Sequence, residues 1–293
     1  MKVGIIGVGL MGHGIARNVL LHDGHSLVFL DHPGNQPVDE LRGLGARACA
    51  TPAALAAVCE VVILCVTGSA QVEAIIAGEN GLISGLNPGT VIVDCSTSLP
   101  NSTLRMGAAI REAGGDYLDA PMTRTARHAH EGSLNLLVGG EAEVLDRVRP
   151  VLDAFTETVS HVGPLGHGHR LKLLHNFVSV GFMSLLAEAA AQAADAGIAP
   201  QVLVDVLAGG GGASAALDRL APYIVEGDRE GLPFAIANAQ KDIDYYRAMS
   251  EDAGARQTIA DGVATALAAA AAAGHGQAYV PELVRIFRRD DIA

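Results

Sequence analysis

The chain has 293 residues, of which 49% are hydrophobic, so it can bury a substantial core in one large domain or two ordinary ones. Its 32 acidic residues outnumber 20 lysines and arginines, which gives a formal net charge of -12. This charge would repel a phosphate backbone or an anionic membrane surface, so we expect neither a nucleic acid nor a membrane as a partner.

The cysteine pattern argues against a disulfide framework and against a zinc site. None of the four cysteines shows CxxC spacing, and Cys65 and Cys95 lie inside apolar runs, where free thiols behave as small hydrophobes. The first residues lack the features of a secretory signal, and no uninterrupted apolar stretch reaches the roughly 18 to 20 residues that span a bilayer. We therefore expect a cytoplasmic protein without a metal site.

Short β-rich runs alternate with periodic helical stretches in the first half of the chain. Strands are predicted at residues 3–6, 26–30, 61–66, 90–94, 116–119 and 133–138, and helices at 10–21, 52–58, 99–113 and 141–154. This alternation predicts βαβ units around a parallel sheet, that is, a doubly wound α/β domain.

The second half of the chain has a helical character. Residues 166–196 form an apolar segment much longer than the mean helix of about 11 residues, and Gly197 followed by Pro200 is a plausible stop. An alanine-rich run at 264–273 predicts a further helix. We place the domain boundary at Gly163, with the α/β domain at 1–163, an all-helical domain at 164–293, and a long interdomain helix between them.

A glycine pattern lies where the first predicted strand passes into the first predicted helix. It reads Gly7-Val-Gly9-Leu-Met-Gly12, and in this context it predicts the dinucleotide-binding turn of a Rossmann-type domain. The first glycine permits a tight turn, the second lets the backbone approach a pyrophosphate, and the third allows close helix packing. The helix N-terminus offers N–H groups to the anion. The alternative is an ordinary strand-to-helix turn.

Asp31 stands at the end of the second predicted strand, where its carboxylate can accept hydrogen bonds from an adenosine ribose. A carboxylate there would repel a 2′-phosphate, and the following His32-Pro33 pair supplies no suitable base, so we prefer NAD over NADP. The alternative is a solvated strand end. The remaining residues expected to contact the cofactor from these loops are Leu10, Met11, Val66 and Thr67.

Lys172 and Asn176 are four residues apart in the long predicted helix, so they share one face and both can point at one ligand. A lysine in a desolvated site can exchange a proton with a substrate hydroxyl while hydride moves to a nicotinamide. Most lysines on helices are solvated surface residues, which is the competing interpretation. Arg170, Lys172 and His175 interrupt a segment whose remainder is apolar enough to be buried, and this favours a functional role.

Over essentially its whole length the chain resembles a known family, the β-hydroxyacid dehydrogenases, which include 3-hydroxyisobutyrate dehydrogenase. The stretches that carry the resemblance are Gly7-Val-Gly-Leu-Met-Gly12, Asp94-Cys-Ser-Thr97, Asp119-Ala-Pro-Met-Thr123 through Gly132 to Val138-Gly-Gly140, Gly166 with Lys172-Leu-Leu-His-Asn176, and Lys241-Asp242.

The resemblance implies that Lys172 is the catalytic acid/base, that Asn176 helps to hold the substrate, and that Thr97 and Lys241 lie close to the cofactor. We also expect Ser96, beside Thr97, to contact the substrate. The resemblance further implies that the long helix bridges the two domains, that the active site lies in the cleft between them, and that the helical domain mediates a homodimer or homotetramer.

One motif departs from the family pattern. Better-known members carry a Ser-Gly-Gly triplet that binds the substrate carboxylate, whereas this chain has Thr123-Arg124-Thr125. Arginine presents a planar fork of donors, which predicts a substrate with a stronger or additional anionic group and resembles the sulfolactaldehyde reductase branch. The alternative is that Arg124 points away and pairs with Glu131 or another surface acid. His128 and His130 nearby fit loop histidines better than metal ligands.

The leading hypothesis is therefore an NAD-dependent oxidoreductase that acts on a small anionic β-hydroxy acid, or a hydroxy sulfonate, and the matching aldehyde or ketone. Two alternatives within enzymes are an imine reductase and a 6-phosphogluconate dehydrogenase-like enzyme. A third alternative is a non-catalytic, nucleotide-binding regulatory protein. This alternative is disfavoured because the chain has Lys172, Asn176 and Lys241 together.

Overall fold

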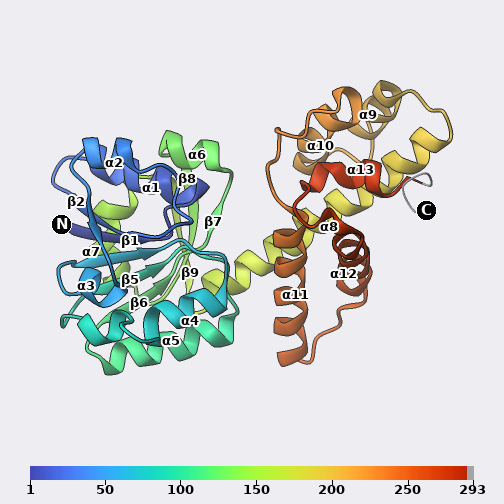
Figure 1. The fold of residues 1–293 in the computed structure, drawn as a ribbon. Helices are drawn as coiled ribbons and strands as arrows, with labels where there is room; N and C mark the ends of the chain where they lie inside the picture. Colours follow the sequence, from blue (N-terminus) through green and yellow to red (C-terminus); the bar gives the residue numbers. More distant parts are fainter. Residues whose placement is uncertain (289–293) are drawn as a thin grey trace. The chain divides into compact units, whose positions relative to one another are not determined.

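A computed structural model of the chain describes residues 1–288, so residues 289–293 of the predicted second domain lie outside the described residues. The chain divides into two compact units, the first comprising Met1–Lys172 and the second beginning at Leu173 (Figure 1). The strands of the first unit are β1 (Lys2–Ile6), β2 (Ser26–Leu30), β3 (Arg47–Cys49), β4 (Val61–Leu64), β5 (Val91–Asp94), β6 (Asp116–Asp119), β7 (Met122–Thr123), β8 (Leu134–Gly139) and β9 (Thr156–Gly163). Its helices are α1 (Leu10–Leu21), α2 (Asp39–Gly43), α3 (Pro52–Ala56), α4 (Ser69–Ala77), α5 (Pro100–Glu112), α6 (Ala126–Glu131) and α7 (Ala142–Leu152).

The described strands form one nine-stranded sheet in the order β3-β2-β1-β4-β5-β6-β8-β7, with β9 paired to β8. Every neighbouring pair from β3 to β6 is parallel, which confirms the predicted doubly wound sheet. β8 is antiparallel to β6 and to β7 and parallel to β9. The chain runs outward from β1 to β2 on one side and continues at β4 on the other, so the carboxyl ends of β1 and β4 border the crevice where such sheets bind ligands.

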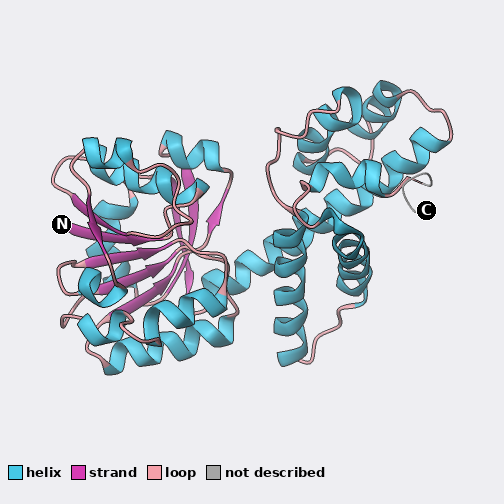
Figure 2. Cartoon of the chain, viewed as in Figure 1, coloured by secondary structure: helices cyan, strands magenta, loops and turns pink. Residues whose placement is uncertain are grey.

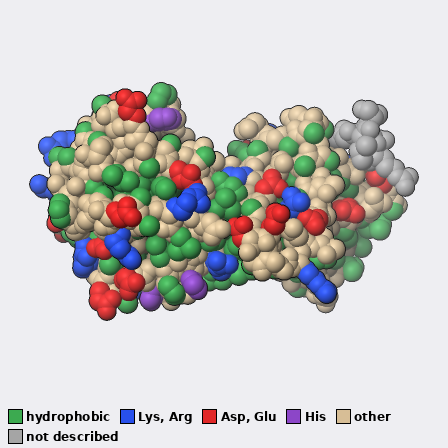
Figure 3. Space-filling model, turned by 90° about the horizontal axis from the view of Figure 1, so that it is seen from below, with side chains coloured by type: hydrophobic (Ala, Val, Ile, Leu, Met, Phe, Trp, Pro, Cys, Tyr) green, Lys and Arg blue, Asp and Glu red, His purple; other side chains and the backbone are tan. Residues whose placement is uncertain are grey.

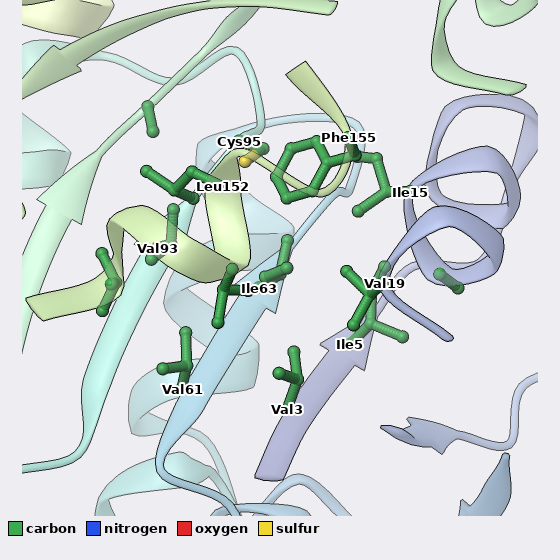
Figure 4. Packing of buried hydrophobic residues seen from close by; sticks show 14 of the residues in the cluster. Val3, Ile5, Ile15, Val19, Val61, Ile63, Val93, Cys95, Leu152 and Phe155 are labelled. Atoms are coloured by element: carbon green, nitrogen blue, oxygen red, sulfur yellow. The ribbon is translucent and has the colours of Figure 1, made fainter. Parts of the chain in front are cut away.

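Apolar side chains cover both faces of the sheet, as the near-continuous apolar strands require. Val61 and Ile63 of β4 belong to one core with α1 and α7, whereas Val62 and Leu64 belong to the opposite core with α3, α4 and α5. Figure 4 shows the first core, where strand residues meet Ile15 and Val19 of α1 and Phe155 after α7. Helices on both faces thus hold the sheet rigid, and loops at its carboxyl edge carry most of the candidate site residues.

Several predicted elements have the expected bounds, and others were missed. α1, β2 and β6 span the predicted residues, and the other strands and helices predicted before residue 197 differ by one or two residues at an end. The helix predicted at 264–273 is displaced, because the observed α-helix spans Thr258–Ala270. The strands and α-helices of the first unit that were not predicted are α2, β3, α4, α6, β7 and β9. Four of them, α2, β3, α6 and β7, have only two to six residues, and the side chains of β9 are only partly buried or exposed, so these elements leave no strong periodic apolar signal.

The regular elements of the second unit are helices, as predicted, apart from one isolated β-bridge between Ala235 and Tyr279 in its described residues (Figure 2). It contains most of α8 (His167–Asp195), together with α9 (Pro200–Ala208), α10 (Ala215–Glu226), α11 (Ile236–Asp252), α12 (Thr258–Ala270) and α13 (Leu283–Ile286). Its core combines apolar residues of α8, such as Met183 and Leu186, with Leu217 of α10, Ile243 of α11 and Leu267 of α12. The division between the units falls inside α8, after Lys172.

By length and composition alone, α8 is long and apolar enough to cross a membrane. This was not expected from the sequence, because no uninterrupted apolar stretch in it is long enough. The length and composition of α8 are weak evidence for a membrane span because core helices of globular proteins pass the same test. Of the most apolar window of 18 residues in α8, 44% is buried inside the protein.

Candidate active site

The turn from β1 to α1 has the backbone geometry that its three glycines predict. Gly7 has φ +98°, and a Cβ built there would lie 2.2 Å from the carbonyl oxygen of Cys65. A Cβ on Gly12 would lie 1.9 Å from the carbonyl oxygen of Gly7. Nothing lies within 4 Å of a Cβ built on Gly9. Gly7 and Gly12 are therefore required by the turn itself, whereas the space in front of Gly9 is open to a ligand.

The N-terminus of α1 is suited to an anion. Gly9 is its N-cap residue, no side chain caps the helix, and its first turn contains no acidic residue. The N–H groups and the positive end of the helix dipole therefore face no acidic side chain from the first turn of α1 itself. Asp31 follows β2 and is exposed. The turn, the open space at Gly9 and the carboxylate at the end of β2 fit a dinucleotide.

The loops after β4 and β5 are joined by hydrogen bonds at the carboxyl edge of the sheet. The backbone N–H of Val66 donates to the Ser96 hydroxyl at 3.1 Å, and the N–H of Ser96 donates to the Asp94 carboxylate at 2.9 Å. Ser96 is buried, whereas Thr97 is half-buried and Thr67 is exposed. The structure thus brings four predicted site residues into two neighbouring loops, with Ser96 already engaged in holding the loops together.

Asn176 and Lys241 of the second unit meet at one buried carboxylate. The Asn176 side-chain amide donates to Asp242 Oδ2 at 2.6 Å, and Lys241 Nζ lies 2.9 Å from Asp242 Oδ1. Asn176 and Asp242 are 7% and 3% exposed. Lys241 also lies over the Tyr245 ring, 5.1 Å from its centroid. Asp242 therefore fixes the orientation of both residues.

Lys172 lies one helical turn before Asn176 in α8 and is half-buried. The two residues share a helix face because they are four positions apart. A half-buried amine on the same face as an oriented amide can reach a substrate and exchange a proton with it.

The Thr123-Arg124-Thr125 segment leads from β7 to α6, and Arg124 has an unusual backbone conformation, with φ +80°. Its Nη1 donates to the carbonyl oxygen of Ser133 at 2.6 Å and to the carboxylate of Glu157 on β9. The hydrogen bond to Glu157 raises the pKa of Arg124, and the same contact lowers the pKa of Glu157.

Comparison with known proteins identifies the family. A family model for the NAD binding domain of 6-phosphogluconate dehydrogenase matches residues 2–163, and one for the NAD-binding of NADP-dependent 3-hydroxyisobutyrate dehydrogenase matches residues 166–287. The 2-(hydroxymethyl)glutarate dehydrogenase of Eubacterium barkeri is 32% identical over 83% of this chain and 80% of its own. The chain belongs to the β-hydroxyacid dehydrogenase family. It is thus an NAD(P)-dependent oxidoreductase with a Rossmann-type domain.

Two further relatives resemble this β-hydroxyacid dehydrogenase. The NAD-dependent L-serine dehydrogenase of Pseudomonas aeruginosa is 32% identical over 90% of this chain and 87% of its own. The crystal structure of 3-hydroxyisobutyrate dehydrogenase from Salmonella typhimurium is 28% identical, with a TM-score of 0.86, and covers 98% of this chain and 100% of its own. The fold is therefore that of the family along nearly the whole chain.

Two carboxylates to which no sequence pattern gave a role contact predicted site residues of this β-hydroxyacid dehydrogenase. Asp242 lies in the Lys241-Asp242 motif, but its contact with Asn176 joins helices far apart in the chain. Glu157, the partner of Arg124, lies on the unpredicted strand β9. Glu131, the acid named from the sequence, pairs with Arg127 one helical turn away. Arg124 pairs instead with another surface acid, Glu157, which the alternative interpretation of Arg124 also allowed. A search for acidic residues near each predicted cation could have found Asp242, but not Glu157.

Proposed function

We propose that this enzyme interconverts a small anionic β-hydroxy acid, or a hydroxy sulfonate, and the corresponding aldehyde or ketone. Bound NAD supplies the hydride acceptor for the carbinol carbon. In the oxidative direction Lys172 Nζ takes the proton of the substrate hydroxyl, and in the reductive direction it returns that proton to the new alkoxide oxygen. Asn176 holds the substrate, with its amide oriented by Asp242.

The observation that carries this proposal is the arrangement along one face of α8. Lys172 is one turn from Asn176, whose amide donates at 2.6 Å to the buried Asp242 carboxylate. A purely structural amide needs no lysine beside it, whereas proton exchange with a held hydroxyl needs both a base and a fixed hydrogen-bonding partner.

The substrate class follows from the Thr123-Arg124-Thr125 segment. We propose that Arg124, flanked by the two threonine hydroxyls, binds an anionic group of the substrate that simple hydroxy acids lack. Glu157 occupies Nη1 of the guanidinium, which has five N–H donors, so the substrate anion replaces Glu157 or binds beside it. The relative from Eubacterium barkeri is named for a dicarboxylate, which supports a doubly anionic substrate.

A substrate panel tests this proposal. NADH oxidation and NAD reduction are measured with sulfolactaldehyde, succinic semialdehyde, 2-(hydroxymethyl)glutarate, 3-hydroxyisobutyrate, 3-hydroxypropionate and serine, using wild type, Arg124→Gly and Glu157→Gln. We expect a sulfonated or dicarboxylic compound to be preferred, Arg124→Gly to abolish the preference, and Glu157→Gln to keep it. Equal turnover of monocarboxylic substrates with and without Arg124 would remove the anion-binding role.

We propose NAD rather than NADP as the preferred cofactor. The exposed Asp31 carboxylate stands at the end of β2, where it accepts from a ribose diol and repels a 2′-phosphate. The ratio of kcat/KM for NAD to that for NADP should exceed one in wild type and fall in Asp31→Ser. A wild-type preference for NADP would contradict this choice.

We propose a homodimer or homotetramer assembled through the helical unit. Val202 and Val206 lie four residues apart on α9 and are 53% and 68% exposed, so they share one face of this helix. Ile198, two residues before α9 begins, adds an apolar side chain that is 47% exposed. A second copy of the chain would bury these side chains. Light scattering should give a mass above that of the 30.1 kDa chain, and Val206→Lys should lower it. A wild-type monomer would contradict the proposal.

We also propose a cytoplasmic location with no nucleic-acid or membrane partner. On the face drawn in Figure 3, Lys and Arg side chains lie among Asp and Glu side chains and form no continuous basic patch. Recovery of the protein in the membrane pellet after cell lysis would contradict this location.

A further inference from the structure

A cluster of buried polar side chains lies in the first unit, next to the two cofactor loops but outside the predicted site residues. Its centre is His169, in the first turn of α8. His169, Asp94 and Asp119 are each 0% exposed, and Thr103 of α5 is 1% exposed. Burial of a polar group is costly unless the group is hydrogen-bonded. Groups that are buried this completely therefore require specific partners.

Both ring nitrogens of His169 have partners from different parts of the unit. Nε2 lies 3.1 Å from the carbonyl oxygen of Ser96, and Nδ1 lies 2.7 Å from the Thr103 hydroxyl. A carbonyl can only accept, so Nε2 is the donor in the first contact. His169 therefore joins α8 both to the loop after β5 and to α5.

The two carboxylates hold the surroundings of the ring. Asp119, at the end of β6, accepts from the backbone N–H groups of Gly166 at 2.8 Å and His169 at 2.7 Å, so it fixes the start of α8. Asp94, at the end of β5, accepts from the Ser96 N–H at 2.9 Å and the Tyr117 hydroxyl at 2.9 Å. Each carboxylate has an oxygen 3.8 Å from a ring nitrogen of His169.

We infer that His169 is a positioning residue. It holds the loops after β4 and β5 and the first turns of α8 in fixed positions relative to one another. The chain of contacts runs from Lys172, three residues along the same helix, through the His169 ring to the Ser96 carbonyl. From there the Ser96 hydroxyl accepts from the Val66 N–H, which reaches the loop after β4. The inference rests on the proposed function, because in that function Lys172 exchanges a proton with the substrate while NAD is bound.

Two substitutions separate the two contacts of the ring. In His169→Gln the amide nitrogen can occupy the place of Nε2 and keep the bond to the Ser96 carbonyl. In His169→Asn the amide can occupy the place of Nδ1, which keeps the contact with Thr103 and loses the one with Ser96. Thr103→Val is the matched control, because it leaves the contact with Ser96 and removes the contact of the ring with α5, together with the bond from the Thr103 hydroxyl to the Leu99 carbonyl.

The measurements are the NADH dissociation constant by fluorescence titration, kcat and KM for NAD, and the thermal midpoint of unfolding. We expect His169→Asn to weaken NADH binding and to lower kcat, each by about tenfold, because the two loops and Lys172 are then no longer held in fixed positions relative to one another. His169→Gln should retain both values close to wild type. Thr103→Val should lower the thermal midpoint while NADH affinity stays close to wild type.

Equal losses in the Asn and Gln variants, or unchanged NADH affinity and kcat in both, would overturn the inference, because a merely structural histidine shows no such rescue. If His169→Asn does not fold, Ser96→Ala decides: it breaks the contact with Val66, and unchanged NADH affinity would also overturn the inference. If wild type turns over no substrate, the proposed function fails, and the order of NADH affinities still tests His169.

Discussion

Gly7 in the predicted cofactor turn and Arg124 in the predicted substrate segment both have left-handed backbone conformations. The physical reason differs between the two residues. At Gly7 a side chain is excluded, because a Cβ would lie 2.2 Å from the Cys65 carbonyl oxygen. At Arg124 a long side chain is present and is anchored by the Ser133 carbonyl and the Glu157 carboxylate. The cofactor turn is thus determined by backbone packing, and the predicted substrate segment by side-chain contacts.

The two places differ in what they tolerate. A turn fixed by backbone packing depends on its glycines. A segment fixed by side-chain contacts can change its charge without altering the sheet. Substitutions at the two places should therefore have different kinds of effect.

The largest effect is expected for Gly7→Ala. The added Cβ meets the Cys65 carbonyl, and alanine tolerates φ +98° poorly, so the turn must move. We expect a lower thermal midpoint together with loss of measurable NADH binding. Gly43→Ala in α2 is the control, because nothing lies within 4 Å of its Cβ. Equal stability of the two variants would contradict a packing requirement at Gly7.

The next effect is expected for Gly9→Ala, which separates binding from folding. Nothing lies within 4 Å of its Cβ, so the thermal midpoint should remain close to wild type. NADH affinity should fall by about tenfold or more, because the methyl group stands where the pyrophosphate approaches the backbone. Calorimetric titration measures the affinity, and an unchanged value would place the dinucleotide elsewhere.

A smaller effect on stability is expected for Arg124→Gly. Relief of the left-handed strain is offset by the lost exposed ion pair and by the greater freedom of glycine in the unfolded chain. The thermal midpoint should therefore stay close to wild type, while the substrate preference shifts toward monocarboxylic compounds. A large loss of stability with unchanged preference would make Arg124 a structural residue.

The smallest effect concerns Cys65, whose carbonyl oxygen borders the Gly7 turn. Burial of its thiol and the nearby Asp94 raise the Cys65 pKa to about 12. An unfolded thiol titrates at about 8.5, so its contribution to stability is complete below that pH and is lost as the pH rises toward 12. Stability measured by urea unfolding should fall over this window, less steeply in Cys65→Ala. Equal slopes in both proteins would contradict burial of the thiol.

Local patterns in the sequence predicted the parallel sheet, α1, and the glycine turn, because these depend on the period of apolar residues and on glycine spacing. β9 could not be predicted, since its polar residues are ordered by pairing with β8 rather than by their own pattern. The same limit applies to Asp242 and Asn176, which are 66 residues apart and meet only when α8 and α11 pack together. Contacts between distant elements require the folded structure.

Lys172→Ala decides whether Lys172 exchanges the proton with the substrate while the Rossmann-type domain binds the cofactor. NADH affinity and turnover of the best substrate of the panel are measured side by side with wild type. We expect kcat to fall by at least about a hundredfold with unchanged NADH affinity. Retained turnover in a variant that binds NADH normally would contradict the role of Lys172.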